Sequence, residues 1–191
     1  MRCLKRYRGL ILFLLLAAGA WYAVFDYLID FRNPDVPFVV TPHDVVDEML
    51  NLAEAKPGDM LVDLGSGDGR VLIAAGKRGI TSRGIEIDPE WADKSRVLIA
   101  EAGLSDKAKV VRGDIFRENF KDATVVTMFL KVDLNARLRP QIDQLKPGTR
   151  IVSHMWSMPG ATPVKTIDVK SPADGHEHRV HLWITPISWK D

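Results

Sequence analysis

Three acidic residues, each close to the end of a short apolar run, have the types and spacing to bind a charged ligand. Asp63 stands in the run Met60–Leu64, the glycine-rich segment 65–70 follows at once, and Glu86 and Asp114 come at the ends of two later runs. In an open parallel sheet, ligands bind where the carboxyl ends of the strands meet. Three carboxylates at that edge would attract a ligand with positive charge, and an acid after the second strand accepts hydrogen bonds from ribose hydroxyls. We therefore expect a site for a cationic nucleoside.

The glycine-rich segment supports this choice of ligand. It consists of Gly65-Ser66-Gly67-Asp68-Gly69-Arg70, between an apolar run and a helical pattern, which is typical of the first unit of a strand–helix–strand fold. Compared with the dinucleotide fingerprint, the third glycine comes one residue early. Asp63 and Asp68 would repel a pyrophosphate but attract a cationic amino acid. The sequence thus favours a nucleoside joined to a cationic group over a dinucleotide.

Alternating strand and helix patterns predict the elements that position these acids. A helix is expected to open at Thr41-Pro42, with the hydroxyl of Thr41 as its cap. A second helix is expected over 133–145, kinked or split by Pro140. Strands are expected at 60–64, 83–88, 108–112, 122–130 and 150–155, followed by an antiparallel hairpin of 163–169 and 179–186. The fold class is therefore α/β, a Rossmann-like sheet with a C-terminal hairpin.

The N-terminus has a different composition. Residues 1–8 carry four basic side chains and no acid, and 9–25 carry no charge, so a hydrophobic helix over 9–29 marginally matches a bilayer. We expect an uncleaved membrane anchor, with a cleaved signal peptide as the alternative. The expected organisation is a basic and hydrophobic segment over 1–32, a proline-containing linker over 33–37 and one domain over 38–191.

The motifs resemble those of class I S-adenosylmethionine-dependent methyltransferases. The resemblance rests on the stretches 63–69, 84–86 and 113–114. It implies S-adenosylmethionine as cofactor, bound by Asp63, Gly65, Ser66, Gly67, Gly69, Glu86, Ile87, Asp114 and Ile115.

A narrower resemblance is carried by the stretches 37–59, 126–130 and 138–154. They are similar to a family of small membrane-linked methyltransferases whose eukaryotic members modify lysines of the ATP synthase c subunit and the adenine nucleotide translocase. This resemblance implies methyl transfer to a lysine of a membrane-associated protein. Phe129 stands where tyrosine is expected, and the region after His154 is short. Both differences lie on the side where the substrate is expected.

A lysine nucleophile must first lose a proton, because its ordinary pKa is about 10.4. An apolar, aromatic pocket favours the neutral amine by desolvation, and Phe129 and Trp156 are the candidates for its wall. His154, at the end of the fifth expected strand, is the candidate proton acceptor or substrate partner. An equally good interpretation of His154 is a histidine satisfied by neighbours at a strand end. Asp133 and Asn135 are further candidates for orienting an amine.

The amino-acid composition argues against several classes of binding partner. The apolar fraction of 46% is too high for a disordered chain, and the net charge of +1 argues against a nucleic-acid surface. Cys3 is the single cysteine, so the chain can form neither an internal disulfide nor a cysteine-based metal site. His176, Glu177, His178 and His181 suggest a metal, but strand alternation puts 181 on the opposite face from 176 and 178, so we expect none.

Two other functions stay open: methyl transfer to a lipid or small molecule at the membrane, and a non-catalytic nucleoside-binding domain. Two observations also disagree about the side of the membrane on which the domain lies. The basic N-terminus favours a domain outside the cytoplasm, whereas S-adenosylmethionine is held inside cells. We expect the domain to face the cytoplasm or an equivalent compartment, and the basic end also fits an organellar import signal.

Overall fold

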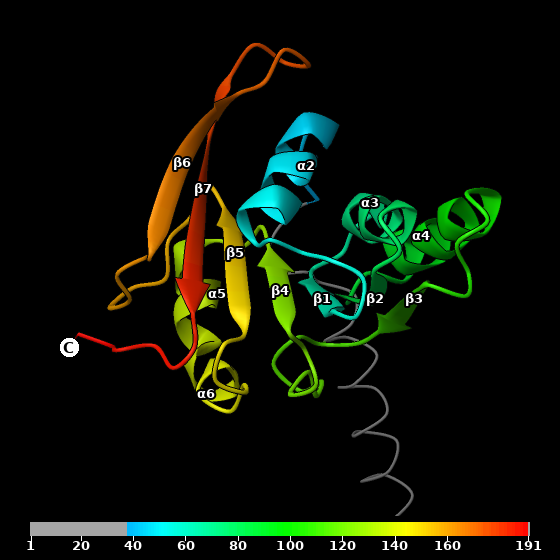
Figure 1. The fold of residues 1–191 in the computed structure, drawn as a ribbon. Coiled ribbons are helices and arrows are strands. Elements are labelled where there is room, and N and C mark those ends of the chain that lie inside the picture. The colour runs from blue at the N-terminus through cyan, green and yellow to red at the C-terminus, as the bar shows by residue number, and fades with distance from the viewer. Residues whose placement is uncertain (1–37, 191) are drawn as a thin grey trace, which may run out of the picture. The chain divides into compact units, whose positions relative to one another are not determined.

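A seven-stranded sheet with the order β3-β2-β1-β4-β5-β7-β6 organises the chain (Figure 1). The computed structural model describes residues 38–190. Neighbours among the first five strands are parallel, whereas β7 is antiparallel to both β5 and β6. The strands are β1 Met60–Leu64, β2 Thr81–Glu86, β3 Ala108–Arg112, β4 Val125–Met128, β5 Arg150–His154, β6 Lys165–Lys170 and β7 Glu177–Ile184. The predicted Rossmann-like α/β sheet with a C-terminal hairpin is confirmed.

Five helices cover the sheet within the described part of the chain. They are α2 His43–Leu52, α3 Arg70–Lys77, α4 Pro89–Glu101, α5 Val132–Arg137 and α6 Arg139–Ile142. Helix α4 has the usual signals of a helix N-terminus. The side chain of Asp88 caps it by accepting hydrogen bonds from the N–H groups of Glu90 and Trp91, and Pro89 is its first residue. The predicted split of the 133–145 helix is confirmed, because α5 and α6 separate at Leu138 with Pro140 in the first turn of α6.

The sheet is buried on both faces, and strand alternation decides which side chains lie on each. Leu61 packs with the apolar residues of α2 and α3, whereas Val62 and Leu64 pack with those of α5 and α6. Val152 of β5 and Val180 of β7 belong to the α2 side. Because side chains two residues apart share a face, Asp63, Thr127, His154 and His178 lie on the α2 side too.

One expectation about α2 is wrong. The hydroxyl of Thr41 does not cap the helix, which begins at His43 with Pro42 before it and no side-chain cap. The Thr41 hydroxyl instead lies 3.1 Å from Nδ1 of His154, at the end of β5. A buried imidazole is a better partner for this hydroxyl than a helix N–H that other groups and water can satisfy.

The predicted hydrophobic segment 9–29 and the linker 33–37 lie outside the described residues. Between residues 38 and 190, no helix is long and apolar enough to cross a membrane.

Candidate active site

The glycine-rich loop between β1 and α3 is shaped by its glycines. Gly67 and Gly69 have φ angles of 52° and 79°, which favour glycine. A Cβ atom on Gly67 would lie 2.2 Å from the ring of Phe38, and one on Gly69 would lie 2.2 Å from Oγ of Ser95. The loop is therefore closely covered, and its main chain turns so that the N–H of Gly67 donates to Oε2 of Glu86 at 2.7 Å.

Glu86 ends β2 with a buried carboxylate. Its Oε1 accepts from the N–H of Asp88 at 2.9 Å, so both carboxylate oxygens are held by main-chain N–H groups. Burial raises the pKa of Glu86, and the hydrogen bonds from main-chain N–H groups partly oppose that rise. The predicted ribose-binding acid thus lies beside the glycine loop.

Asp63 of β1 is buried next to Thr127 of β4, whose hydroxyl donates to Oδ1 at 2.7 Å. Burial, together with the negative charges of Glu86 and Asp68, raises the pKa of Asp63 to about 7 against the opposing hydrogen bond from Thr127. A positive ligand group near Asp63 would restore its charge. This is the strongest sign within the site that a cation binds there.

The other predicted cofactor residues surround the same edge. Asp114 follows β3; its Oδ1 accepts from the N–H of Phe116 at 2.9 Å, and Oδ2 lies 3.4 Å from Nε of Arg117. Ile87 and Ile115, half-buried, follow β2 and β3. Ser66 is buried, and among the described residues its hydroxyl has no hydrogen-bond partner.

The donor set fits S-adenosylmethionine better than a pyrophosphate. Arg70, the cation nearest the loop, is already engaged: its guanidinium bonds both carboxylate oxygens of Asp68 and the carbonyl of Thr41. Burial opposes the charge of Asp68, but the contacts with Arg70 outweigh it and leave the pKa of Asp68 below its usual value. Asp63 and Glu86 remain for the cationic amino acid and the ribose.

Affinity for S-adenosylmethionine is expected to rise with pH around neutrality. With a pKa of about 7, Asp63 is mostly protonated at pH 6, and a cationic ligand must displace that proton. Linkage then makes binding about 10-fold weaker at pH 6 than at pH 8. Calorimetric titration at both pH values measures this, and Asp63→Asn should remove the difference. Equal wild-type affinities at the two pH values would show that Asp63 does not titrate on binding.

A second cluster lies at the carboxyl ends of β4 and β5. The ring centroids of Phe129 and His154 are 4.1 Å apart. His154 is 1% exposed, and both ring nitrogens have partners, Thr41 at Nδ1 and His178 at Nε2. Burial and, to a lesser extent, the neighbouring His178 lower the pKa of His154 to about 4. The imidazole is therefore neutral at physiological pH.

The turn after β5 carries Trp156. Met155 has a positive φ of 63°, and the N–H of Trp156 donates to the carbonyl of His154 at 2.7 Å, so the chain makes a strained γ-turn. Ser153 and Asn135 hold this turn through the carbonyl of Trp156. The Trp156 side chain is 45% exposed, so it lies at the surface beside the cluster rather than within it.

The sequence brings Phe129 and His154 together correctly, but it misses Thr41, His178 and Asp174. The sequence pattern suggests a role for His178 only as a metal ligand. Within residues 38–190, no group of acids, histidines and cysteines could hold a metal ion. One sequence signal could have predicted the burial of His178. This histidine lies on the same strand face as the apolar residues Val180 and Leu182, because side chains two residues apart share a face. The catalytic roles of Phe129, His154 and Trp156 stay predictions.

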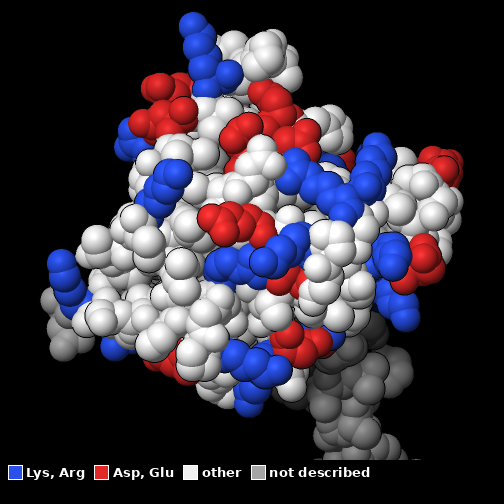
Figure 2. Space-filling view, in the orientation of Figure 1, with Lys and Arg blue, Asp and Glu red and all other residues white. Residues whose placement is uncertain are grey.

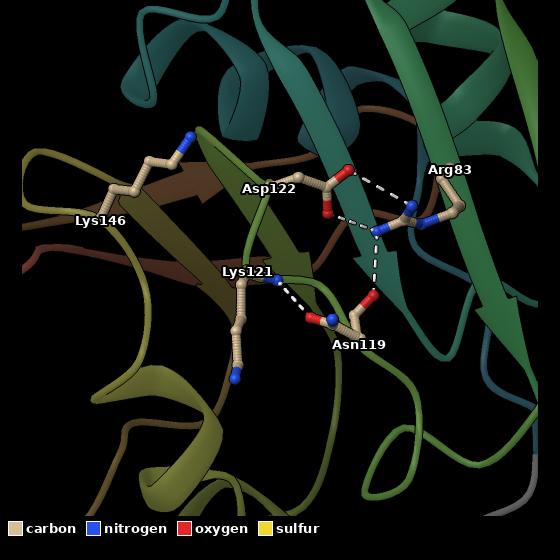
Figure 3. Close-up of a pocket in the computed structure, with 5 residues that line it drawn as sticks. All are labelled: Arg83, Asn119, Lys121, Asp122 and Lys146. Carbon is tan, nitrogen blue, oxygen red and sulfur yellow. Dashed lines mark hydrogen bonds and ion pairs between the residues drawn. The ribbon is translucent and has the colours of Figure 1, made fainter.

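A separate surface depression lies away from these strand ends (Figure 3). Asn119, Lys121 and Asp122 come from the loop that leads into β4, and Lys146 comes from the turn before β5. Arg83 spans the depression and bonds the carboxylate of Asp122 and the carbonyl of Asn119. The depression therefore lies at the amino ends of β4 and β5, whereas the candidate active site lies at their carboxyl ends.

Known proteins similar to this chain include methyltransferases, as the cofactor-binding geometry of the site leads one to expect. The family model described as the ANTKMT methyltransferase domain matches residues 63–165. A protein-lysine N-methyltransferase of Saccharolobus islandicus is 39% identical over 79% of this chain and 94% of its own. The adenine nucleotide translocase lysine N-methyltransferase of Mus musculus is 30% identical over 83% and 74%.

A solved structure supports the cofactor. The RNA methyltransferase from Salinibacter ruber, crystallised with S-adenosyl-L-homocysteine, has a TM-score of 0.72 and 43% identity, covering 78% of this chain and 94% of that one. Its bound product matches the nucleoside chemistry of the strand ends described above. The chain belongs to the ANTKMT methyltransferase domain family and is an S-adenosylmethionine-dependent methyltransferase.

Proposed function

We propose that this methyltransferase modifies a lysine amine of a membrane-associated protein. Two relatives named as lysine N-methyltransferases support the lysine, one of them acting on the adenine nucleotide translocase. The observation that carries the membrane-associated part is a set of exposed apolar side chains around Phe129 and His154, called here the apolar rim: Val39, Val40, Val132, Met155 and Trp156.

The apolar rim contains five of the eight large apolar side chains that are exposed among residues 38–190. Contacts bring its parts together. The Thr41–His154 hydrogen bond holds Val39 and Val40 near the end of β5, and the Asn135 side chain, one turn after Val132, binds the carbonyl of Trp156. Gathered exposed apolar side chains are typical of a surface that binds a partner or a membrane. They suit an acceptor lysine surrounded by apolar residues.

The residues at this edge could divide the chemistry as follows. When bound, S-adenosylmethionine supplies an activated methyl group on a sulfonium. Phe129 would line an apolar approach that favours the neutral amine by desolvation. His154, neutral because of its burial, adds no positive charge that would repel an incoming ammonium. The main contribution of the chain would be to align the amine with the methyl group, an effect that can supply about 7–11 kcal/mol.

Residues 9–29 are proposed to anchor the chain, with its methyltransferase domain in the cytoplasm or an equivalent compartment. The uncharged stretch supports the anchor, and the cofactor supports the compartment because S-adenosylmethionine is held inside cells. Carbonate extraction of membranes tests the anchor, and protease treatment of intact and lysed cells tests the compartment. Release by carbonate, or digestion of the domain from the outside of intact cells, would contradict this placement.

RNA is a second candidate acceptor, because the Salinibacter ruber relative is named an RNA methyltransferase. The charge distribution of this chain gives it little support. The net charge is +1, and acidic and basic side chains are interspersed over the face drawn in Figure 2. A protein that binds RNA through phosphates needs a basic stripe or patch.

A labelling experiment decides between the acceptors. The full chain is mixed with S-adenosylmethionine labelled in its methyl group and with washed membranes, soluble protein or total RNA from the source organism. We expect label in membrane protein, removed by protease. Label that resists protease and extracts with lipid would indicate the lipid alternative, and label that ribonuclease removes would indicate RNA. The absence of label from all of these fractions would contradict the proposed membrane-protein acceptor.

A further inference from the structure

Four side chains form a continuous hydrogen-bonded row beside the candidate active site. Oγ1 of Thr41 lies 3.1 Å from Nδ1 of His154, whose Nε2 lies 2.9 Å from Nδ1 of His178. Nε2 of His178 lies 3.0 Å from Oδ2 of Asp174. The row joins the segment that leads into α2, the end of β5, the start of β7 and the loop between β6 and β7. These segments are distant in sequence, so the fold itself assembles the row.

With a neutral His178, the partners fix the direction of every hydrogen bond in the row. The N–H of His176 and the imidazole of His178 hold the pKa of Asp174 below its usual value, so Asp174 is a carboxylate and can only accept. His178 must therefore donate from Nε2, and when neutral it has a bare Nδ1. His154 then donates from Nε2 and accepts at Nδ1 from the hydroxyl of Thr41. All three hydrogen bonds point from Thr41 towards Asp174.

The two ends of the row lie in different surroundings. Thr41, His154 and His178 are buried, whereas the Asp174 side chain is 36% exposed. The inner end touches the cofactor loop, because the guanidinium of Arg70 donates to the carbonyl of Thr41 at 2.7 Å. The row therefore connects the neighbourhood of the glycine loop with bulk water.

Other charged groups near the row have partners of their own. Asp44 of α2 accepts from the hydroxyl of Ser171 in the β6–β7 loop, and Arg70 of α3 pairs with Asp68. Lys170 and Glu177, opposite each other at the ends of β6 and β7, are exposed, as is His176. Within residues 38–190, Asp174 is the one acid hydrogen-bonded to either imidazole.

We propose that Thr41, His154, His178 and Asp174 form a proton relay that carries the proton of the acceptor amine from the active site to solvent. The proposal rests on the proposed lysine methylation. It assigns Thr41 a direct contact with the amine, and His154, His178 and Asp174 positions further along the relay.

The proton balance follows the hydrogen bonds. The ammonium gives one proton to Oγ1 of Thr41 and keeps the lone pair that attacks the methyl group. The original hydroxyl proton of Thr41 passes to Nδ1 of His154, and the Nε2 proton of His154 passes to Nδ1 of His178. His178 is then an imidazolium beside the Asp174 carboxylate, the arrangement that stabilises its charge, and it loses its Nε2 proton to water at the exposed end. Both imidazoles are then protonated at Nδ1, and each must exchange this proton for one at Nε2 before the next turnover.

Nitrogen NMR of the histidine side chains tests the direction of the relay without any acceptor. The relay requires that His154 in the folded full chain near neutral pH be a neutral imidazole protonated at Nε2, and that Nδ1 of His178 carry no proton. Protonation of His154 at Nδ1 would reverse the first two hydrogen bonds and overturn the proposal.

The pH dependence of turnover tests whether the relay carries the proton of the amine during catalysis. His178→Asn keeps an acceptor near the position of Nδ1 but cannot take up a proton, and Asp174→Ala removes the carboxylate. Asp168→Asn is the matched control, because it breaks an exposed ion pair with Arg179 on the same hairpin and leaves the relay intact. The measured quantity is kcat for methyl-lysine formed in the washed membrane fraction, at saturating S-adenosylmethionine between pH 6.5 and 10.

The relay predicts that His178→Asn and Asp174→Ala lower kcat at least about 10-fold near pH 7, below the usual effect of a general base because water substitutes in part. The loss should shrink towards pH 10, where the free amine deprotonates unaided. A loss of equal size at every pH, or no loss, would overturn the relay while methyl-lysine from the wild type still supports the function. No methyl-lysine from the wild type would contradict the proposed function, and the relay with it.

Discussion

Replacing Glu86 by alanine is expected to weaken S-adenosylhomocysteine binding by about 100-fold or more. The carboxylate holds the N–H groups of Gly67 and Asp88 and is the predicted partner of the ribose hydroxyls. Hydrogen bonds to a charged group contribute about 1.5–3 kcal/mol each, and two lost ribose contacts alone amount to about 3 kcal/mol or more. The glycine loop would also lose the contact that fixes Gly67. Calorimetric titration of the full chain measures the change.

Glu90→Ala is the control for this experiment, because Glu90 is an exposed acid on α4 that lies close in sequence and makes no side-chain contact with the loop in the described structure. Its affinity should stay within about 2-fold of the wild type, as is usual for surface substitutions. Thermal unfolding of both variants checks that the fold is retained. An unchanged affinity of folded Glu86→Ala would remove Glu86 from the cofactor site.

Replacing Phe129 by alanine is expected to lower kcat by about 100-fold while cofactor affinity changes by less than about 3-fold. The ring packs on His154 with centroids 4.1 Å apart, at the carboxyl end of β4. Its loss would let His154 and the acceptor amine move, and a misplacement of about 1 Å can cost about 100-fold in rate. Turnover in the washed membrane fraction and calorimetric affinity are measured on the same preparation.

Phe129→Tyr is the matched variant, since it keeps the ring and adds the hydroxyl expected in related sequences. It should retain most of the turnover. Equal losses of turnover and cofactor affinity in Phe129→Ala would mean that Phe129 supports packing rather than the acceptor pocket.

The cofactor half of the site could be predicted because its signals are local. A glycine loop directly after a strand and acids at strand ends are arranged by the chain within a few residues, and parallel strands bring those ends to one edge. Asp63, Glu86 and Asp114 are accordingly found at neighbouring strand ends. The fold class follows from the same alternation of strands and helices.

The acceptor half depends on contacts that no local pattern contains. Thr41 meets His154 across more than 100 residues of sequence, and His178 reaches it only because β7 inserts antiparallel beside β5. The local rule that made Thr41 a helix cap was wrong, because a long-range partner took its hydroxyl. The residue types at 176–181 suggest a metal site. In the fold, His178 is buried and its imidazole is instead hydrogen-bonded to that of His154.

The most direct test of the account is the identity of the atom that gains the methyl group. The full chain is incubated with trideuteromethyl-labelled S-adenosylmethionine and washed membranes, and the labelled protein is digested and sequenced by mass spectrometry, with Glu86→Ala as the inactive reference. We predict a trideuteromethyl group on the side-chain nitrogen of a lysine in a membrane protein, absent from the reference. Label on another residue type, or on RNA or lipid with unlabelled lysine, would contradict the account.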